Sequence, residues 1–344
     1  MTVVLPRAGT ISFPDDEGRH AGATDEWWYF NSHLSSNDGK SYGLAVCFFP
    51  SYILGILVDV AARKVVHIST SVGLPFRGST RRLDIKCGPN WWVQDGEAPS
   101  RYSMHYEAEG LSAYLTMEVR KRPLLLNGTG IIREGLLGRS FYFAQTLLRV
   151  GGTISVEGRE TRVEGKGWID RQWGNWEWSG LGGWKWFSIQ LDNNVEVAGI
   201  QIYHPLTYGN VVESFNLCDD TGTGEPLRSV SVRETAKWKS SGTGFEYGVG
   251  WDIVSPSLFE LRISPYAESQ EINAGLWEGC CEVTGAYRGI EVTGRAWVEQ
   301  SVSRVRGGWL RRAFFLGIGA VDYVMSKPGP KVNLLELALR KVPT

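Results

Sequence analysis

Two stretches of the chain, WWYFNSHL at residues 27–34 and WKWFSIQL at residues 184–191, share an aromatic opening followed by alternating apolar positions. Each is followed by a turn rich in Asn and Asp and then by a second alternating run. Successive side chains of a β-strand point to opposite faces, so a period of two predicts strands. The similarity of the two stretches also suggests that one structural unit occurs twice.

A second pair of stretches closes each unit. VEGKGWID at residues 163–170 aligns with VTGRAWVE at residues 292–299, and a short predicted hairpin precedes each. We interpret the ordered landmarks as a duplicated β unit; the alternative is chance similarity among strands rich in Gly and Trp. The hinge SGLGG at residues 179–183 separates the units. We therefore predict two domains, residues 1–178 and residues 179–344.

The composition indicates the fold class. The 344 residues include 42 Gly and 15 Trp, and 42% of them are hydrophobic. Gly between short apolar runs is typical of tight turns, and abundant Trp indicates an aromatic interior. Helical periodicity is weak, and only residues 130–148 and 333–340 are expected to form short helices. The sequence predicts an all-β fold with closed or nearly closed sheets and few short helices.

The charge balance and the absence of known motifs exclude several functions. Lys and Arg (36) balance Asp and Glu (37), which argues against a general nucleic-acid binder. The sequence contains no Walker A loop, no dinucleotide fingerprint between a strand and a helix, and no G-x-S-x-G elbow. It also lacks His and Cys at metal-binding spacing, so we predict no metal site.

The sequence also predicts a compartment. It has no secretory signal pattern at its N-terminus, and its five Cys form no C-x-x-C pair. We therefore expect free buried thiols in the reducing cytoplasm. The apolar stretch 314–324 is too short to span a bilayer. A packed C-terminal segment is favoured there, and a peripheral membrane contact is the alternative.

The densest aromatic segment is GKGWIDRQWGNWEW at residues 165–178. In an extended strand Trp168, Asp170 and Gln172 share one face, and Arg171 lies on the other. A carboxyl among indole rings is poorly solvated, which favours its neutral form and suits Asp170 to general acid catalysis. Arg171 could instead keep an acid ionised. Alternatively, Asp170 and Arg171 form structural pairs where the two domains meet.

Glu26 lies in a second segment of this kind, DEWWY at residues 25–29. In a strand Glu26 and Trp28 point one way while Asp25 and Trp27 point the other, so one carboxylate faces inward beside aromatic rings. Glu26 is a candidate catalytic residue, although a structural pairing with an Arg is slightly favoured. The two candidate partners are Arg171 and Arg295.

We expect the ligand pocket at the seam between the two units, where the Trp residues are concentrated. At the end of an alternating strand lies His204, either a proton carrier or a hydrogen-bonded residue at the rim. Both closing acids, Asp170 and Glu299, are candidates to face the ligand. The residues predicted to contact the substrate are Trp28, Trp168, Trp173, Trp184, Trp186, Gln190, Tyr203, His204 and Trp297.

Three motifs carry a family resemblance: EWWYFNSHL at residues 26–34, GWIDRQWG at residues 167–174 and WKWFSIQL at residues 184–191. They resemble the hydroxyneurosporene synthase (carotenoid 1,2-hydratase) and AttH-like family, and more distantly the fungal decalin-forming Diels–Alderases. The resemblance spans roughly residues 15–300. It implies two packed lipocalin-like β-barrel or sandwich domains, an apolar pocket in or between them, and no metal or organic cofactor.

The resemblance also implies a role for Asp170, which matches the acid thought to protonate the alkene in the hydratases. The chain departs from the hydratase pattern in being shorter. It also carries Arg171-Gln172 where many relatives have His and another residue. Both departures concern the hydration reaction more than the fold.

Three functions follow from these observations. The first is a cofactor-independent cyclase for a hydrophobic polyene or polyketide intermediate, in which Asp170, Arg171, Tyr203 and Gln190 orient and polarise the substrate. The second is a hydratase in which Asp170 protonates an isoprenoid double bond and aromatic faces stabilise the cation. The third is a lipocalin-like carrier without chemistry. We expect the cyclase.

Overall fold

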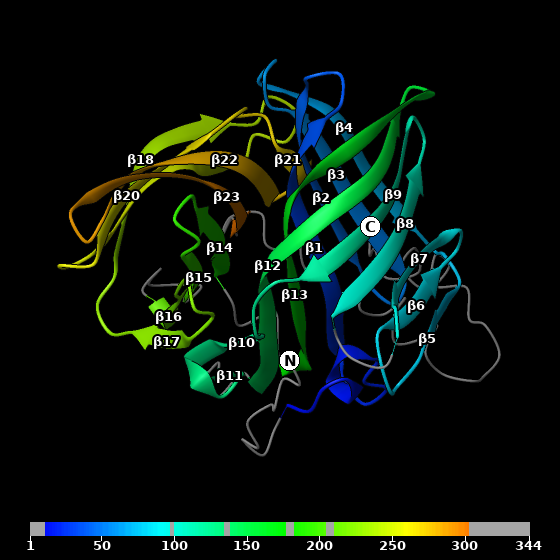
Figure 1. The fold of residues 1–344 in the computed structure, drawn as a ribbon, viewed down its shortest axis with the longest axis horizontal. Coiled ribbons are helices and arrows are strands. Elements are labelled where there is room, and N and C mark those ends of the chain that lie inside the picture. The colour runs from blue at the N-terminus through cyan, green and yellow to red at the C-terminus, as the bar shows by residue number, and fades with distance from the viewer. Residues whose placement is uncertain (1–10, 97–99, 134–137, 177–181, 204–209, 303–344) are drawn as a thin grey trace, which may run out of the picture.

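The computed structural model describes residues 11–96, 100–133, 138–176, 182–203 and 210–302. It is built from two curved antiparallel sheets, which form two lipocalin-like domains (Figure 1). Within the described residues, the helical elements are two short 3-10 turns, η1 (Asp15–Glu17) and η2 (Leu126–Gly128). The predicted all-β fold is confirmed.

The first sheet follows the order β4-β3-β2-β1-β13-β12-β9-β8-β7-β6-β5, and β10 and β11 both pair with β12. Its strands are β1 (Asp25–Ser36), β2 (Ser41–Phe48), β3 (Tyr52–Asp59), β4 (Lys64–Val72), β5 (Phe76–Gly78), β6 (Asp84–Cys87), β7 (Asn90–Gln94), β8 (Arg101–Ala108), β9 (Leu111–Val119), β10 (Leu124–Leu125), β11 (Ile131–Arg133), β12 (Gly138–Val156) and β13 (Arg159–Trp176).

The second sheet follows the order β17-β16-β15-β14-β23-β22-β20-β19-β18, and β21 pairs with β22. Its strands are β14 (Gly183–Leu191), β15 (Glu196–Tyr203), β16 (Asn210–Cys218), β17 (Gly224–Leu227), β18 (Ser231–Lys239), β19 (Glu246–Ser255), β20 (Phe259–Pro265), β21 (Glu271–Asn273), β22 (Leu276–Tyr287) and β23 (Ile290–Val302).

The two sheets share one layout. In each, the four opening strands stand in reverse order beside the closing strand, which is β13 in the first sheet and β23 in the second. The register agrees as well, because Tyr29 pairs with Asp170 on β13 and its counterpart Trp186 pairs with Glu299 on β23. This agreement supports the duplication inferred from the aligned sequence stretches.

The chain leaves the first sheet after Trp176 and enters the second at Gly183. The predicted domain boundary at residue 178 falls between these strands, outside the described residues. The predicted helix at 333–340 and the apolar stretch 314–324 also lie outside the described residues. In the part of the chain that is described, no helix is long and apolar enough to span a membrane.

The prediction of a helix at residues 130–148 is wrong. The described part of this segment forms strand β11 and residues 138–148 of strand β12. β12 lies in the middle of the first sheet, between β13 and β9. Its middle portion is buried on both faces, so apolar residues do not alternate there as they do in a half-buried strand. Their spacing therefore resembles a helical pattern.

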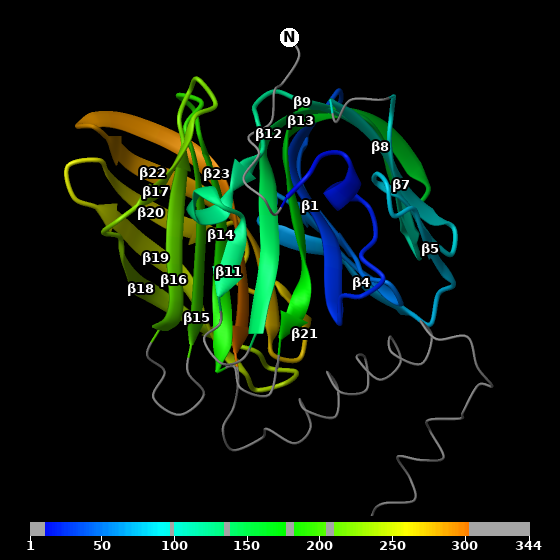
Figure 2. The ribbon, with the colours of Figure 1, turned by 90° about the horizontal axis from the view of Figure 1, so that it is seen from below.

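Three large apolar cores and one small one, around Ile11, Phe143 and Trp173, lie within the described residues. Each sheet curls around a core of its own, and a third core, which we call the seam, lies between the two domains. Figure 2 shows the strands β12 and β13 of the first domain beside β14 of the second. The seam includes Tyr29, Trp168, Trp186 and Trp297.

One close approach in the seam requires a glycine. A Cβ on Gly43 of β2 would lie 2.2 Å from the Sγ atom of Cys280 and 3.1 Å from the Trp297 ring. The bare backbone therefore allows β2 to pack directly against the second domain.

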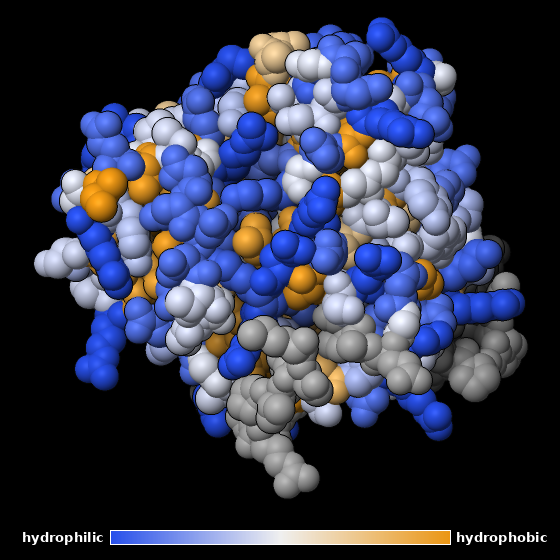
Figure 3. Space-filling model, in the orientation of Figure 1, coloured by the Kyte–Doolittle hydropathy of each residue, from blue (hydrophilic) through white to orange (hydrophobic). Residues whose placement is uncertain are grey.

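The cysteines are buried inside the molecule, and the surface is mostly hydrophilic. All five Cys are buried and none forms a disulfide, so the expectation of free buried thiols is confirmed. On the face shown in Figure 3, hydrophilic side chains cover most of the surface and apolar ones are scattered between them. The apolar residues are thus concentrated inside the domains and in the seam.

Candidate functional site

A buried carboxyl lies at the centre of the seam. Asp170 is 2% exposed, and β13 places it opposite Tyr29 of β1. The Nε1 atom of Trp168 donates a hydrogen bond to Asp170 Oδ1 at 2.9 Å, and the Tyr142 hydroxyl donates to the same oxygen. The other oxygen, Oδ2, has no hydrogen-bond partner among the described residues. One carboxyl oxygen is thus anchored and the other is left unpaired.

The environment of Asp170 favours its neutral form. Burial raises the pKa of Asp170 well above its usual range, and the nearby Glu299 acts in the same direction. Hydrogen bonds from Tyr142 and Trp168 act to lower the pKa but do not outweigh burial. A neutral carboxyl can donate a proton, which is the property required of a general acid.

Two further carboxyls face the seam from the second domain. Glu278 on β22 and Glu299 on β23 are cross-strand neighbours, and their side chains are hydrogen-bonded to each other. The Tyr29 hydroxyl donates to Glu278 Oε2 at 3.1 Å, and Trp184 Nε1 donates to Glu299 Oε1. Burial, followed by the neighbouring Glu299, raises the pKa of Glu278 well above its usual range. Because two hydrogen-bonded carboxyls repel when both are ionised, the neighbouring Glu299 favours the neutral form of Glu278.

We call Asp170, Glu278 and Glu299 the seam carboxyls. None of them forms an ion pair with a Lys, Arg or His of the described chain. Buried carboxylates are normally paired with a cation or protonated. The lack of a nearby cation therefore favours the protonated form of Asp170 and Glu278.

The seam carboxyls open onto a cleft with two lobes. The larger lobe has a volume of about 1090 Å³ and contains Glu278, while the smaller has about 570 Å³ and contains Asp170; both volumes include space open to solvent. Four residues line both lobes, so the lobes adjoin: Trp27, Tyr29, Trp184 and Glu299. The lining is mostly aromatic and aliphatic, as expected for an apolar ligand.

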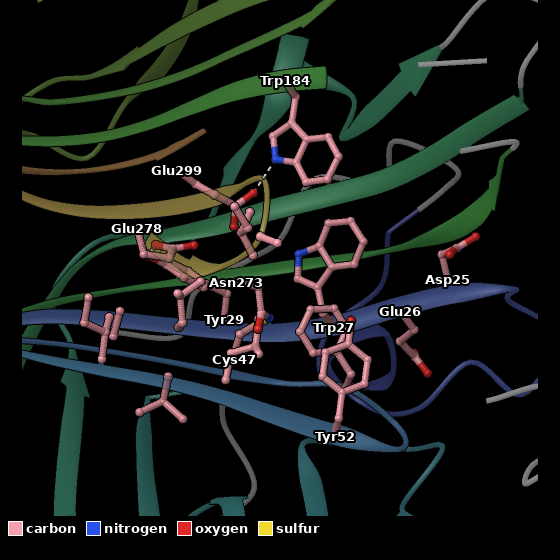
Figure 4. Close-up of a pocket in the computed structure, with 18 of the residues that line it drawn as sticks. Asp25, Glu26, Trp27, Tyr29, Cys47, Tyr52, Trp184, Asn273, Glu278 and Glu299 are labelled. Carbon is pink, nitrogen blue, oxygen red and sulfur yellow. Dashed lines mark hydrogen bonds between the residues drawn. The ribbon is translucent and has the colours of Figure 1, made fainter. Parts of the chain in front are cut away.

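Figure 4 shows how the larger lobe is arranged. Trp27 lies between Trp184 and Tyr52, and Glu278 and Glu299 lie together on one side. Glu26 lies on the other side of the lobe. The ring of Trp27 thus lies between the paired acids of the second domain and Glu26 of β1.

The structure brings three of the predicted Trp residues to the cleft or to its acid. Trp184 and Trp186 line the smaller lobe, and Trp186 Nε1 donates to the Tyr142 hydroxyl at 3.1 Å. Trp168 is fully buried and holds Asp170. His204 lies outside the described residues.

Glu26 and Arg171 form a buried ion pair on the opposite face of β1 and β13. The Arg171 guanidinium contacts the Glu26 carboxylate and lies 4.0 Å from the centre of the Trp28 ring. It also donates to the backbone oxygens of Trp27 and Gln172, both at 3.1 Å. Burial is the largest influence and acts to raise the pKa of Glu26, but Arg171 and the hydrogen bonds with His20 together hold the pKa below the usual range. Of the two Arg partners considered for Glu26, the structure shows Arg171.

This ion pair changes our view of both residues as catalytic candidates. Arg171 lines neither lobe of the cleft, and its donors are taken up by the protein itself. Glu26 lies at the edge of the larger lobe, but its carboxylate is bound to Arg171. The geometry gives both residues a structural role, because β1 and β13 alternate and turn them away from Asp170.

The remaining predicted contact residues line neither lobe. Trp28 belongs to the core of the first domain, and Trp173 stacks on a His20 ring 4.2 Å away. Gln190 Nε2 donates to backbone oxygens of the first domain, and the Tyr203 hydroxyl donates to Gln201 at 2.9 Å. Trp297 is fully buried in the seam. Gln190 and Trp297 thus connect the two domains, whereas Trp28, Trp173 and Tyr203 pack within their own domain.

Sequence reasoning missed three residues of the site. Tyr142 lies in the segment expected to be a helix, which hid the face it presents to Asp170. Tyr29 stands in the opening aromatic motif, but the motif alone does not show that its hydroxyl reaches Glu278. Glu278 carries no sequence signal of its own beyond its place in a strand that precedes the closing strand. Its role depends on pairing with Glu299 across two strands.

A buried acid outside the cleft gives a pH-dependent stability. Glu17 is 3% exposed and accepts a hydrogen bond from the Tyr102 hydroxyl. Burial is the largest influence on Glu17 and raises its pKa from 4.5 to about 7. The folded state therefore holds a proton that the unfolded state releases between these two values.

The sign of the effect follows from this raised pKa. The contribution of Glu17 to stability is fully present below pH 4.5 and is lost as the pH rises through about 7. Between these pH values the wild type should lose on the order of 3 kcal/mol of its free energy of unfolding through Glu17, and Glu17→Gln should not show this loss. Urea unfolding of wild type and variant at several pH values measures the difference. Equal pH slopes for the two proteins would refute the prediction.

Comparison with known proteins identifies the family. A family model described as AttH-like matches residues 59–302. A putative AttH from Nitrosomonas europaea has 24% identity and a TM-score of 0.73, covering 86% of this chain and 98% of its own. Kievitone hydratase from Nectria haematococca has 17% identity and a TM-score of 0.73, covering 86% and 94%.

A third solved structure, CghA, has 13% identity and a TM-score of 0.54, covering 87% of this chain and 95% of its own. At these identities the structural likenesses show a shared fold. No curated protein sequence matches the chain significantly. The family model nevertheless covers more than half of the chain, which confirms the resemblance found in the sequence motifs. The chain belongs to the AttH-like family.

Proposed function

We propose that the protein is a cofactor-independent hydratase that adds water to a carbon–carbon double bond of an apolar small molecule. The observation that carries this proposal is Asp170, a buried acid at the cleft with one anchored and one unpaired oxygen. Its raised pKa favours the form that can give up a proton. The proposal includes a cytoplasmic location and a hydrophobic small-molecule substrate, such as an isoprenoid.

The geometry suggests the following steps. The apolar chain of the substrate lies in the larger lobe, and its double bond lies near Asp170. Asp170 transfers its proton to one alkene carbon, and the positive charge that develops on the other carbon faces Trp and Tyr rings. Water attacks this carbon, and Glu299 accepts the proton that the water loses. The product is an alcohol, and proton return from Glu299 restores Asp170.

One comparison and one physical argument support this reaction class. Kievitone hydratase, which has the same fold, is by its name a hydratase. A carrier, by contrast, has no need for an acid held neutral beside its ligand. These points support hydration over simple ligand transport, although the identity of 17% concerns the fold alone.

A cyclase is the second candidate, and the same acid favours it. A neutral Asp170 can donate a hydrogen bond to a substrate carbonyl without transferring a proton, and this would polarise a polyene for cyclisation. The aromatic cleft would hold the chain in a folded, reactive conformation. The sequence favoured this cyclase, whereas the unpaired acid oxygen at the cleft shifts our preference to hydration.

Mass spectrometry in heavy-oxygen water tests the proposal. The purified protein is incubated with a panel of isoprenoids and acyclic polyenes. A hydratase yields a product heavier by one water that carries the heavy oxygen. A product of unchanged mass with one more ring would instead establish the cyclase, and recovery of every compound unchanged would leave the carrier.

A further inference from the structure

We infer that the junction of the two lobes binds a positive charge carried on an apolar ligand, with the Glu278–Glu299 pair as its counter-ion. This inference deepens the proposed function and rests on it where the charge is the carbocation of the reaction. It also assigns the cleft a ligand class that can be tested without the substrate, namely apolar ammonium compounds.

The charges around the pair point to a missing cation. Four titratable side chains on four strands interact with Glu278 or share its field: Tyr29 on β1, Cys47 on β2, Asp170 on β13 and Glu299 on β23. Every one of them is neutral or negative, and none can supply a positive charge. Any negative charge on the pair is thus uncompensated within the described chain.

An independent observation shows that the cluster does not satisfy itself. Asp170 Oδ2 is buried and has no hydrogen-bond partner among the described residues, although Asp170 lines the smaller lobe. Buried oxygens of this kind are normally paired. The unpaired oxygen and the shared wall of the two lobes place an incomplete polar site beside a cavity.

The aromatic rings at the junction suit the same ligand. Trp27, Tyr29 and Trp184 line both lobes together with Glu299. Figure 4 shows Trp184 hydrogen-bonded to Glu299, with Trp27 beside them. Aromatic faces attract cations, most strongly where water is excluded. A carboxylate flanked by such rings therefore recognises a positive charge with apolar substituents.

Cation binding is coupled to proton release. Without a ligand, burial and the neighbouring Glu299 favour the protonated form of Glu278, which limits the negative charge of the pair. A cation at the junction favours ionisation of Glu278, so its proton leaves when the ligand binds. The affinity for a cation consequently rises with pH, whereas the affinity for a neutral analogue does not.

Isothermal titration calorimetry tests the inference with three probes that share an eight-carbon chain: octyltrimethylammonium, 1-octanol and octanoate. The two charged probes are used below their micelle concentrations and 1-octanol below its solubility limit. We expect octyltrimethylammonium to bind at least about 10-fold more tightly than 1-octanol, and octanoate to bind most weakly. Titration in two buffers that differ in ionisation enthalpy should show proton release for the ammonium probe alone.

Matched variants locate the effect. Glu278→Gln and Glu299→Gln should each abolish the preference for the ammonium probe, while Glu282→Gln should retain it. Glu282 is the control because it lies on the same strand β22 but is 42% exposed and near Arg63. If the two seam variants fail to fold, the pH dependence and proton release of the wild-type protein decide the question.

Equal affinity for octyltrimethylammonium and 1-octanol, or a preference that survives both seam variants, overturns the inference. Its failure can be told apart from failure of the proposed function. If the ammonium probe binds with proton release but Asp170→Asn leaves substrate turnover unchanged, the cation site is supported and the acid role of Asp170 is refuted. If the ammonium probe shows no preference but Asp170→Asn abolishes turnover, the acid role is supported and the cation site is refuted.

Discussion

Asp170→Asn is expected to lower the rate of water addition by about 10²–10⁴-fold, the usual contribution of a general acid. Asparagine has nearly the same shape and can still accept the hydrogen bonds from Trp168 and Tyr142. It has no acidic proton to give, so the variant keeps the geometry and loses the chemistry. The measurement is kcat for the alkene that gains water in the heavy-oxygen assay.

The control for this variant is Asp84→Asn, which changes a half-exposed carboxyl on β6 outside the cleft. Both variants should unfold at close to the wild-type temperature. A turnover of Asp170→Asn within about threefold of wild type would contradict the acid role. Such a result, together with a cyclised product, would favour the cyclase, because an amide can still donate a hydrogen bond.

Arg171→Met is expected to reduce the free energy of unfolding by about 3–5 kcal/mol, as when one partner of a buried ion pair is removed. The variant leaves the Glu26 carboxylate buried, at 4% exposed, and without the guanidinium of Arg171. It also removes the donors to the backbone oxygens of Trp27 and Gln172. Urea unfolding at neutral pH measures the loss.

The matched control is Lys237→Met, which removes one side of an exposed ion pair with Glu246; the side chains of this pair are 60% and 55% exposed. Exposed pairs contribute about 0–1 kcal/mol, so this variant should unfold almost as the wild type does. If Arg171→Met and Lys237→Met lose the same small amount, Arg171 is not the structural anchor that the geometry indicates.

Much of the fold could be predicted because its signals are local. The alternation that begins at Trp27 and again at Trp184 predicts two strands, and both are observed, with most residues on both faces of each strand buried. Alternation also placed Asp170 and Arg171 on opposite faces, where the structure has them. A period of two depends on strand geometry alone, so it can be read without knowledge of the tertiary structure.

The parts that could not be predicted depend on contacts between distant strands. The Tyr142 hydroxyl reaches Asp170 only because β12 is a strand, and burial on both faces concealed its alternation. Likewise Glu278 becomes part of the site through its register with Glu299 and through a hydrogen bond from Tyr29 of the other domain. No spacing along the chain encodes such a contact.

Arg171 illustrates the same limit. The sequence suggested both an orienting group for the substrate and a partner for a buried acid, because it could not show which side chains meet the guanidinium. The structure surrounds Arg171 with Glu26, the Trp28 ring and backbone oxygens, and these contacts favour the role as partner of a buried acid.

The central claim is that Asp170 is a protonated acid in the seam, and infrared spectroscopy tests it most directly. The difference spectrum between wild type and Asp170→Asn at neutral pH reports the carboxyl that the substitution removes. Our account predicts the loss of a carbonyl band from a protonated carboxyl. Loss of carboxylate bands alone, with every protonated carboxyl band unchanged, would contradict it.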